Sequence, residues 1–145
     1  MQVDFYHLDQ SPLERVLPAI CEKVVANGER LLIVAGDALA AQLDDLLWAY
    51  AADSFLPHGP ADGPAPEAQP ILISGTTEPR NAAANIAIAD GEWRDEALGF
   101  ARTFYFFDAG HLDTARKAWR ALKANSQAEP RYWKQDDRGK WVQGP

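Results

Sequence analysis

The chain is poor in cysteine, because Cys21 is the only one among its 145 residues. A single thiol excludes a disulfide framework and a zinc site built on cysteines, and it is typical of the reducing cytoplasm, where we expect this protein. The three histidines, His7, His58 and His111, are far apart and lack the spacing of metal ligands. We interpret His7 as a structural residue of a strand and His58 as either exposed or packed in a loop. The sequence therefore predicts no metal and no other cofactor.

Long apolar runs and phosphate-binding loops are also missing. No run approaches the ~20 apolar residues that cross a membrane, and the first residues lack the basic, apolar pattern of a secretory leader, so no membrane partner is expected. Neither GxGxxG nor GxxxxGK[ST] occurs, which argues against a dinucleotide or P-loop site. Gly-x-Ser-x-Gly is absent too, so a nucleophile elbow has no support. These absences favour a protein without an active site of its own.

What the chain does have is a strong separation of charge. Residues 114–145 carry eight basic and three acidic side chains, a net of +5, whereas residues 1–113 carry six basic and eighteen acidic ones, a net of −12. Trp119, Trp133 and Trp141, three of the five tryptophans, lie in the basic segment. Aromatic rings beside Arg and Lys can bind nucleobases or an acidic peptide with an apolar tip. A basic tail that only keeps the chain soluble is the remaining alternative.

Strands and helices alternate along the chain, which predicts a single α/β domain over residues 1–145 with a mostly parallel sheet. The expected strands are Val3–Leu8, Arg30–Val34, Ile71–Ser74, Asn85–Ile88 and Arg102–Phe107, followed by a hairpin of Tyr132–Gln135 and Lys140–Val142. The expected helices begin near Ser11 and Asp37 and cover about Thr114–Asn125, with a short, weaker one at Trp93–Phe100. Residues 56–70 hold five prolines and two glycines and are expected to form an extended surface loop.

Two helix starts can be predicted from their capping residues. Ser11 is expected to cap the first helix, with Pro12 in its first position, and Asp37 is expected to cap the second. Pro18 conflicts with the first of these helices, because proline costs ~3 kcal/mol inside a helix. We expect either a kink at Pro18 or a later start.

The last predicted helix combines an apolar arc with a basic one. At 100° per residue, Leu112, Ala115, Ala118 and Leu122 share an arc, the cations Arg116, Arg120 and Lys123 fall beside it, and Trp119 lies where the two arcs meet. This arrangement suits a peptide that ends in apolar side chains and a carboxylate, because arginine binds carboxylates in a forked geometry. An ordinary amphipathic helix with a buried tryptophan is the alternative.

A second segment, Leu43–His58, places Trp48 at the end of an amphipathic helix and Phe55, Leu56 and Pro57 just beyond it. Large apolar groups in this position can form a surface that binds a partner. They can equally well complete the protein's own core.

At these segments the sequence resembles the chi subunit of the bacterial DNA polymerase III holoenzyme, part of the clamp-loader assembly. The most specific stretches are Leu43–Trp48 and Asp53–His58 with the Pro/Gly loop after them. The opening Val3–Tyr6, the basic last helix, and the closing pairs Tyr132-Trp133 and Lys140-Trp141 support the resemblance, which spans essentially the whole chain.

The resemblance implies a non-catalytic, Rossmann-like adaptor that reaches nucleic acid indirectly. Members bind the psi subunit on one surface, which in some members alternatively engages a repair helicase, and the acidic C-terminal tail of single-stranded-DNA-binding protein on another. Carried over to this chain, the psi surface comprises Trp48, Phe55 and Leu56, and the tail site comprises Arg116, Trp119, Arg120 and Lys123. Members have a basic residue one turn before Arg116, where this chain has Leu112. Tyr132, Trp133 and Trp141 are candidates for the far wall of the tail pocket.

The alternative from another functional class is direct binding of single-stranded nucleic acid by the same basic, aromatic C-terminal end.

Overall fold

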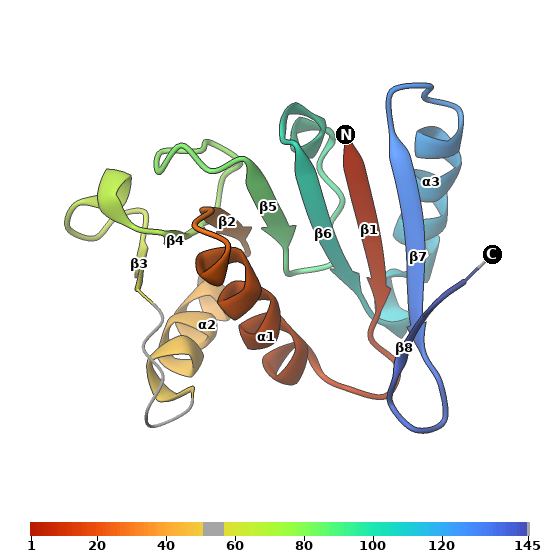
Figure 1. Ribbon diagram of the computed structural model, residues 1–145, viewed down its shortest axis with the longest axis horizontal. Helices are drawn as coiled ribbons and strands as arrows, with labels where there is room; N and C mark the ends of the chain where they lie inside the picture. The colour runs from red at the N-terminus through yellow and green to blue at the C-terminus, as the bar shows by residue number, and fades with distance from the viewer. Residues whose placement is uncertain (51–56, 145) are drawn as a thin grey trace.

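One mixed sheet organises the computed structural model, which describes residues 1–50 and 57–144 (Figure 1). The strands are β1 (Gln2–His7), β2 (Leu31–Val34), β3 (His58–Pro60), β4 (Ile71–Ser74), β5 (Asn85–Ile88), β6 (Arg102–Phe107), β7 (Glu129–Gln135) and β8 (Trp141–Gln143). Their order is β3-β4-β2-β5-β6-β1-β7-β8, and each neighbouring pair is parallel except β7 and β8. The predicted α/β class with a mostly parallel sheet is confirmed, and the fold is consistent with a single Rossmann-like domain.

Continuous apolar runs form the middle of the sheet. All four residues of each of β2, β4 and β5 are buried, as expected for strands that are covered on both faces. Strand β1 is also internal, since it pairs with β6 on one side and β7 on the other. The first strand of the chain therefore lies between β6 and β7, which come near its end. It contributes side chains to both faces of the sheet.

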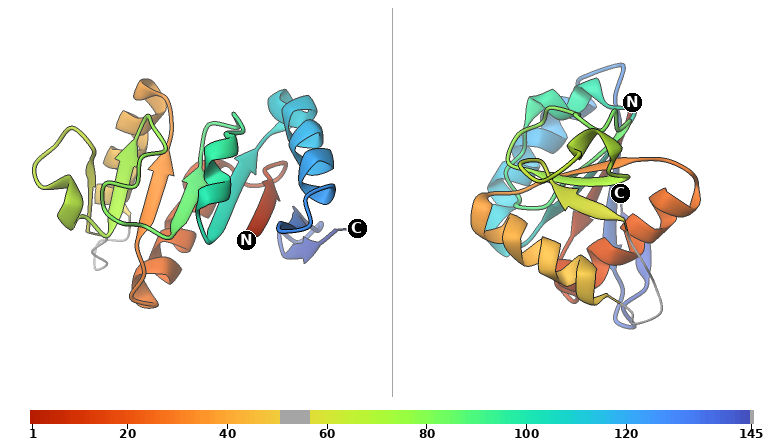
Figure 2. Two further views of the ribbon diagram at one scale, coloured as in Figure 1. Left: turned by 90° about the horizontal axis from the view of Figure 1, so that it is seen from above. Right: turned by 90° about the vertical axis from the view of Figure 1, so that its left-hand side faces the viewer.

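Helices cover the two faces unequally. Helices α1 (Leu13–Ala26) and α2 (Asp37–Ala49) pack against one face, where they share a core with alternate residues of β2, β4 and β6. Helix α3 (Leu112–Lys123) packs against the opposite face with β1, β6 and β7. Seen from above, α1 and α3 lie on opposite sides of the sheet (Figure 2).

Both predicted helix caps are wrong. Helix α1 has Pro12 as its N-cap and α2 has Gly36, and neither cap position makes a side-chain hydrogen bond to the helix. The Ser11 hydroxyl instead accepts a hydrogen bond of 3.0 Å from the side-chain amide of Gln135, which ties the chain before α1 to β7. Asp37 is the first helical residue rather than the cap. Helix α1 does not start late but continues through Pro18, which is buried in it.

The predicted loop at 56–70 is more regular than its composition indicates. His58–Pro60 forms the edge strand β3, parallel to β4, and Pro66–Ala68 forms a short 3-10 helix, η1. An edge strand tolerates Pro60 because the missing N–H faces away from the sheet. The predicted short helix at 93–100 is likewise a 3-10 helix, η2 (Asp95–Gly99), and another, η3 (Ala109–His111), precedes α3.

The predicted C-terminal hairpin is confirmed. Strands β7 and β8 are antiparallel, and the Asp136 carboxylate accepts hydrogen bonds from the backbone N–H groups of Arg138 and Lys140. Gly139 has a φ of 82°, a value that favours glycine. Strand β7 begins earlier than predicted, at Glu129, because its residues 129–133 pair with residues 2–6 of β1.

Candidate functional site: a pocket beneath helix α3

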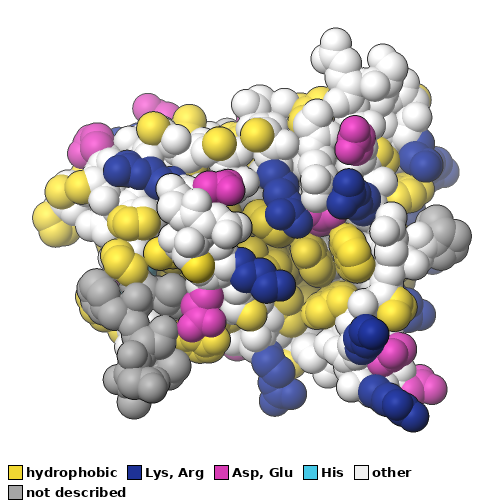
Figure 3. All heavy atoms as spheres, in the orientation of Figure 1, with side chains coloured by type: hydrophobic (Ala, Val, Ile, Leu, Met, Phe, Trp, Pro, Cys, Tyr) yellow, Lys and Arg dark blue, Asp and Glu magenta, His cyan; other side chains and the backbone are white. Residues whose placement is uncertain are grey.

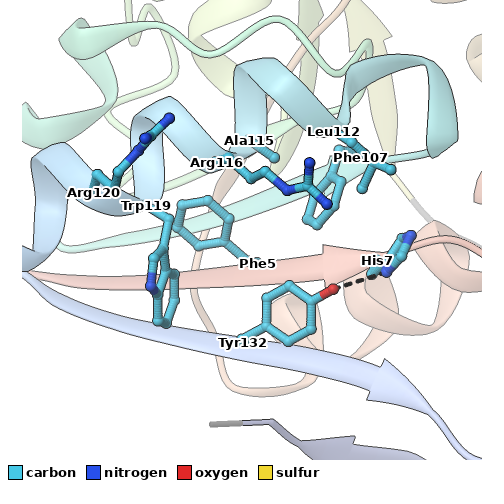
Figure 4. A pocket seen from close by; sticks show the side chains of 9 residues that line it. All are labelled: Phe5, His7, Phe107, Leu112, Ala115, Arg116, Trp119, Arg120 and Tyr132. Carbon is cyan, nitrogen blue, oxygen red and sulfur yellow. Dashed lines mark hydrogen bonds between the residues drawn. The ribbon is translucent and has the colours of Figure 1, made fainter.

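A pocket of about 560 Å³ opens between helix α3 and strands β1 and β7 (Figure 4). It is lined by Phe5, His7, Phe107, Leu112, Ala115, Arg116, Trp119, Arg120 and Tyr132. Most of these side chains are apolar, and the two arginines come from the helix on one side of the opening. Its size and lining are those of a small ligand site or a pocket for a few peptide side chains.

Strand alternation and helical spacing bring these residues together. Phe5 and His7 are two apart on β1 and therefore point to the same face of the sheet, and Tyr132 is the register partner of Phe5 on β7. On α3, Ala115, Arg116 and Trp119 fall on the side that faces β1 and β7. Ala115 and Ala118 are small and buried, so the helix lies close to the sheet and its larger neighbours define the opening.

Aromatic rings form the floor and one wall of the pocket. The Trp119 ring lies edge-on to Phe5, with centroids 5.2 Å apart, and edge-on to Tyr132 at 6.1 Å. Phe107 lies 6.2 Å from both Phe5 and Tyr132. These contacts fix the orientation of Trp119, so the indole presents a preformed apolar surface between α3 and β7 (Figure 4).

His7 and Tyr132 close the pocket at one end. A hydrogen bond of 2.8 Å joins His7 Nδ1 and the Tyr132 hydroxyl, and the imidazole stacks on Phe107 at 5.0 Å. Burial, with a smaller contribution from Asp9, raises the pKa of Tyr132, while the charge of Arg116 opposes the rise. The phenol therefore stays neutral, and the interpretation of His7 as a structural residue agrees with this contact.

The cations of α3 lie at the rim and in solvent. Arg116 and Arg120 are exposed, and the closest carboxylate to Arg116 is that of Asp113, at 3.9 Å. Lys123 does not line the pocket, but its ammonium lies 5.4 Å from the centroid of the Trp119 ring. Leu112 also lines the pocket. The site thus places two guanidinium groups beside an apolar floor.

The three candidates for the far wall do not lie together. Tyr132 lines the pocket, whereas Trp133 and Trp141 lie on the opposite face of the sheet. Successive residues of a strand point to opposite faces, and this alternation separates Tyr132 from Trp133. The basic, aromatic C-terminal end is therefore divided between two surfaces. Phe5, His7 and Phe107, which sequence reasoning did not assign to the site, complete the wall. Alternation along β1 could have indicated Phe5 and His7, whereas Phe107 comes from β6.

The second predicted surface lies at the other end of the molecule. Trp48 is 59% exposed near the end of α2, and its ring lies 4.6 Å from that of His58. His58 is not exposed: it is buried, with Nε2 3.2 Å from Oδ1 of Asp44, which agrees with the alternative of loop packing. A hollow of about 370 Å³ runs past these side chains. Phe55 and Leu56 lie outside the described residues.

Within residues 1–50 and 57–144, no cluster of three or more His, Cys, Asp or Glu side chains could hold a metal ion. The described helices are all too short or too polar to cross a membrane.

Comparison with known proteins identifies one family. The model of the DNA polymerase III chi subunit, HolC, matches residues 1–128, which include every described element except β7 and β8. A comparison with curated proteins gave no match.

Proposed function

The chain belongs to the family of the DNA polymerase III chi subunit, HolC, and from this premise we propose that it tethers the clamp loader to single-stranded-DNA-binding protein. Family membership makes it an accessory subunit of DNA polymerase III in replication. In our proposal the pocket beneath α3 binds the acidic C-terminal tail of single-stranded-DNA-binding protein, and the surface around Trp48 binds psi. The protein then acts by binding two partners at once and needs no active site.

The observation that carries the tail assignment is the combination of an aromatic floor with two exposed arginines. An acidic tail that ends in apolar residues needs both a pocket for its last side chains and cations for its carboxylates. Phe5, Trp119 and Tyr132 supply the first, and Arg116 and Arg120 supply the second. Both arginines are exposed, so they can reach a carboxylate without first leaving a buried ion pair.

A labelled acidic peptide that ends in apolar residues tests this assignment by fluorescence anisotropy. The Trp119→Ala variant should weaken binding at least tenfold, because hot-spot aromatics commonly contribute about 2 kcal/mol or more. Amidation of the peptide's C-terminus removes its terminal charge and should weaken binding to the parent protein. Raising the salt concentration should weaken it as well.

Two matched variants distinguish peptide binding in the pocket from a general attraction between the peptide and the basic helix. Arg116→Ala and Lys117→Ala remove one charge each from neighbouring, exposed positions of α3, but only Arg116 lines the pocket. Equal losses in the two variants would reduce the proposal to nonspecific attraction, and unchanged affinity in Arg116→Ala, Trp119→Ala would reject the site.

The exposed indole of Trp48 supports the second half of the proposal. An exposed tryptophan beside a hollow is typical of a residue that becomes buried in an interface. We expect Trp48→Ala to abolish capture of purified psi while leaving the tail peptide bound. A repair helicase that uses the same surface should compete with psi, and its binding should be lost in the same variant.

The exposed Val142 on β8 provides the matched control, since it is a large apolar residue far from α2. Val142→Ala should capture psi as well as the parent protein does. If Trp48→Ala retains psi as well, the psi surface lies elsewhere.

A further inference from the structure

A second surface, on the sheet face opposite the pocket, is open to solvent and belongs to neither proposed partner site. In Figure 1 no described helix lies in front of β6, β1 and β7, and Figure 3 shows a hydrophobic hollow with Lys and Arg side chains around it on this side. Two adjoining hollows, of about 310 and 340 Å³, share Tyr6, Ile20 and Lys23 and run between α1 and the strands. We call this surface the aromatic trough.

Aromatic side chains from four strands, β1, β6, β7 and β8, lie in or beside the trough, and Tyr6, Phe104 and Trp141 line its two hollows. Tyr6 is nearly parallel to Phe104 and Trp133, at centroid distances of 6.3 and 6.4 Å, and Trp141 meets it edge-on at 5.2 Å. Tyr6, Trp133 and Trp141 are all partly exposed. Aromatic rings that serve only the core are normally buried beneath another element. Three neighbouring rings that stay partly exposed therefore indicate a surface for binding.

The buried carboxylate of Asp4 fixes the positions of two side chains of the trough, Trp133 and Arg102. Asp4 is fully buried between the rings, and it accepts hydrogen bonds from Trp133 Nε1 at 3.0 Å, Arg102 Nε at 3.0 Å and Gln2 Nε2 at 2.9 Å. The Arg102 guanidinium also lies 4.4 Å from the centroid of Phe104. These bonds fix one indole and one cation before any ligand arrives, so little ordering is needed on binding.

Basic side chains lie along the trough, and two of them are paired with carboxylates: Arg102 with Asp4 at 2.9 Å and Arg131 with Glu129 at 4.0 Å. Arg15 and Lys23 on α1 line the two hollows with Arg102, and Arg131 is two residues from Trp133 on the same face of β7. Glu29 is the one acidic side chain of the described residues that lines either hollow, and Asn85 donates a hydrogen bond of 2.8 Å to it. The cations are distributed along the trough rather than gathered at one end.

From these features we propose that the aromatic trough binds single-stranded nucleic acid without strong sequence preference. Phosphates recur along a strand and match cations that are spread along a groove, while partly exposed aromatic rings can pack against bases. An acidic peptide tail fits the pocket beneath α3 better, because its charge and apolar groups are concentrated at one terminus. The proposal does not depend on the tail or psi assignments. It also moves direct nucleic-acid binding from the basic C-terminal end to a surface that this end shares with α1, β1 and β6.

Two charge-reversal variants with the same net charge test the proposal. Arg15→Glu, Lys23→Glu alters the trough, and Arg116→Glu, Arg120→Glu alters the pocket on the other face; all four side chains are exposed. Each variant is titrated against a fluorescein-labelled oligothymidylate of about 15 nucleotides and, separately, against the acidic peptide. We expect the trough variant to lose at least about tenfold in oligonucleotide affinity, and its salt dependence to fall by about 1.4 in log–log slope for two lost phosphate contacts. The pocket variant should retain oligonucleotide binding and lose the peptide.

Trp141→Ala tests the aromatic contribution, with Val142→Ala as its control on the same strand. We expect the first to weaken oligonucleotide binding about fivefold or more, and the second to leave it unchanged, with circular dichroism confirming that both variants fold. The proposal is overturned if the parent protein does not bind the oligonucleotide at low salt, or if the trough and pocket variants lose oligonucleotide affinity equally. It is also overturned if the trough variant loses the peptide but keeps the oligonucleotide, which would make the trough a peptide site.

Discussion

The two faces of the sheet at β1 and β7 use the same strands to build different surfaces. On one face, Phe5, His7 and Tyr132 lie beneath α3 and form a pocket with a closed floor. On the other face, Tyr6 and Trp133 are partly exposed and stack on each other. Neighbouring residues in the sequence, such as Tyr132 and Trp133, therefore serve surfaces that cannot bind one ligand together.

The difference lies in what covers each face. Helix α3 contributes small alanines where it contacts the sheet, and its larger residues, Arg116 and Arg120 among them, line the pocket. The trough has no such cover over β1 and β7 within the described residues, and its order comes from hydrogen bonds to Asp4. A helix thus shapes one surface, while a buried carboxylate shapes the other.

Substitution of neighbouring residues on β1 should separate the two faces most strongly. Phe5 is 1% exposed and touches Trp93, Tyr105, Phe107 and Trp119, so Phe5→Ala should lower the free energy of unfolding by about 3–5 kcal/mol. It should also abolish peptide binding. Tyr6→Ala, its matched control on the other face, should cost less stability and spare the peptide. Urea denaturation and peptide anisotropy measure both, and loss of the peptide in Tyr6→Ala would show that the faces are not independent.

Removal of the Asp4 carboxylate should be the next largest effect. Asp4→Ala leaves Arg102 and the Trp133 indole N–H without their acceptor and should cost about 2–3 kcal/mol, because hydrogen bonds to charged groups are stronger than neutral ones. Chemical denaturation gives the free energy. Glu129→Ala, an exposed carboxylate on β7, should change it by less than about 0.5 kcal/mol. A similar loss in both variants would show that Asp4 does not organise the trough.

Loss of the hydrogen bond between His7 and Tyr132 should have a smaller effect that is confined to the pocket. Tyr132→Phe keeps the ring contacts and removes the hydroxyl, so the expected loss is about 0.5–1.5 kcal/mol in unfolding free energy. Peptide affinity should decline only a few-fold. Thermal or urea unfolding measures the first, and oligonucleotide binding should remain at the parent level. A variant as stable as the parent would show that this bond contributes nothing net.

The smallest expected effect is a pH dependence at the start of α3. Hydrogen bonding to Asp108 raises the pKa of His111, and hydrogen bonding to His111 lowers the pKa of Asp108. The His111 contribution is complete below its unfolded pKa of about 6.5 and is lost as the pH rises through the higher folded value. The Asp108 contribution is present above its unfolded pKa of about 3.9 and is lost as the pH falls through the lower folded value.

The ion pair therefore stabilises the protein most between about pH 4 and 6.5. The side chains of His111 and Asp108 are 30% and 62% exposed, so the gain should stay below about 1 kcal/mol and shrink in salt. His111→Gln should flatten this part of the stability profile, measured as the midpoint of urea unfolding against pH. An unchanged profile would assign the pH dependence to other groups.

Much of the fold could be predicted because it depends on local patterns. The apolar runs at β2, β4 and β5, the helical periodicity of α1 and α3, and the turn at Gly139 are each read from neighbouring residues. The cap at Ser11 was predicted wrongly because Ser11 has a competing partner, Gln135, more than 120 residues away in the chain. The cap at Asp37 was wrong by one residue, since Gly36 occupies that position. The edge strand in the Pro/Gly loop escaped prediction for a similar reason, since its pairing with β4 overrides the local composition.

For the tail site, the sequence by itself determined the chemistry: Arg116, Trp119 and Arg120 on one helix, with aromatic residues in the basic C-terminal segment. Only the tertiary structure decided which of those aromatic residues belong together. Strand β7 pairs with β1, and the register of that pairing places Tyr132 beside Phe5 and leaves Trp133 and Trp141 on the other face. Residue type is written in the chain, but the face and neighbours of a strand residue depend on long-range pairing, which no local pattern specifies.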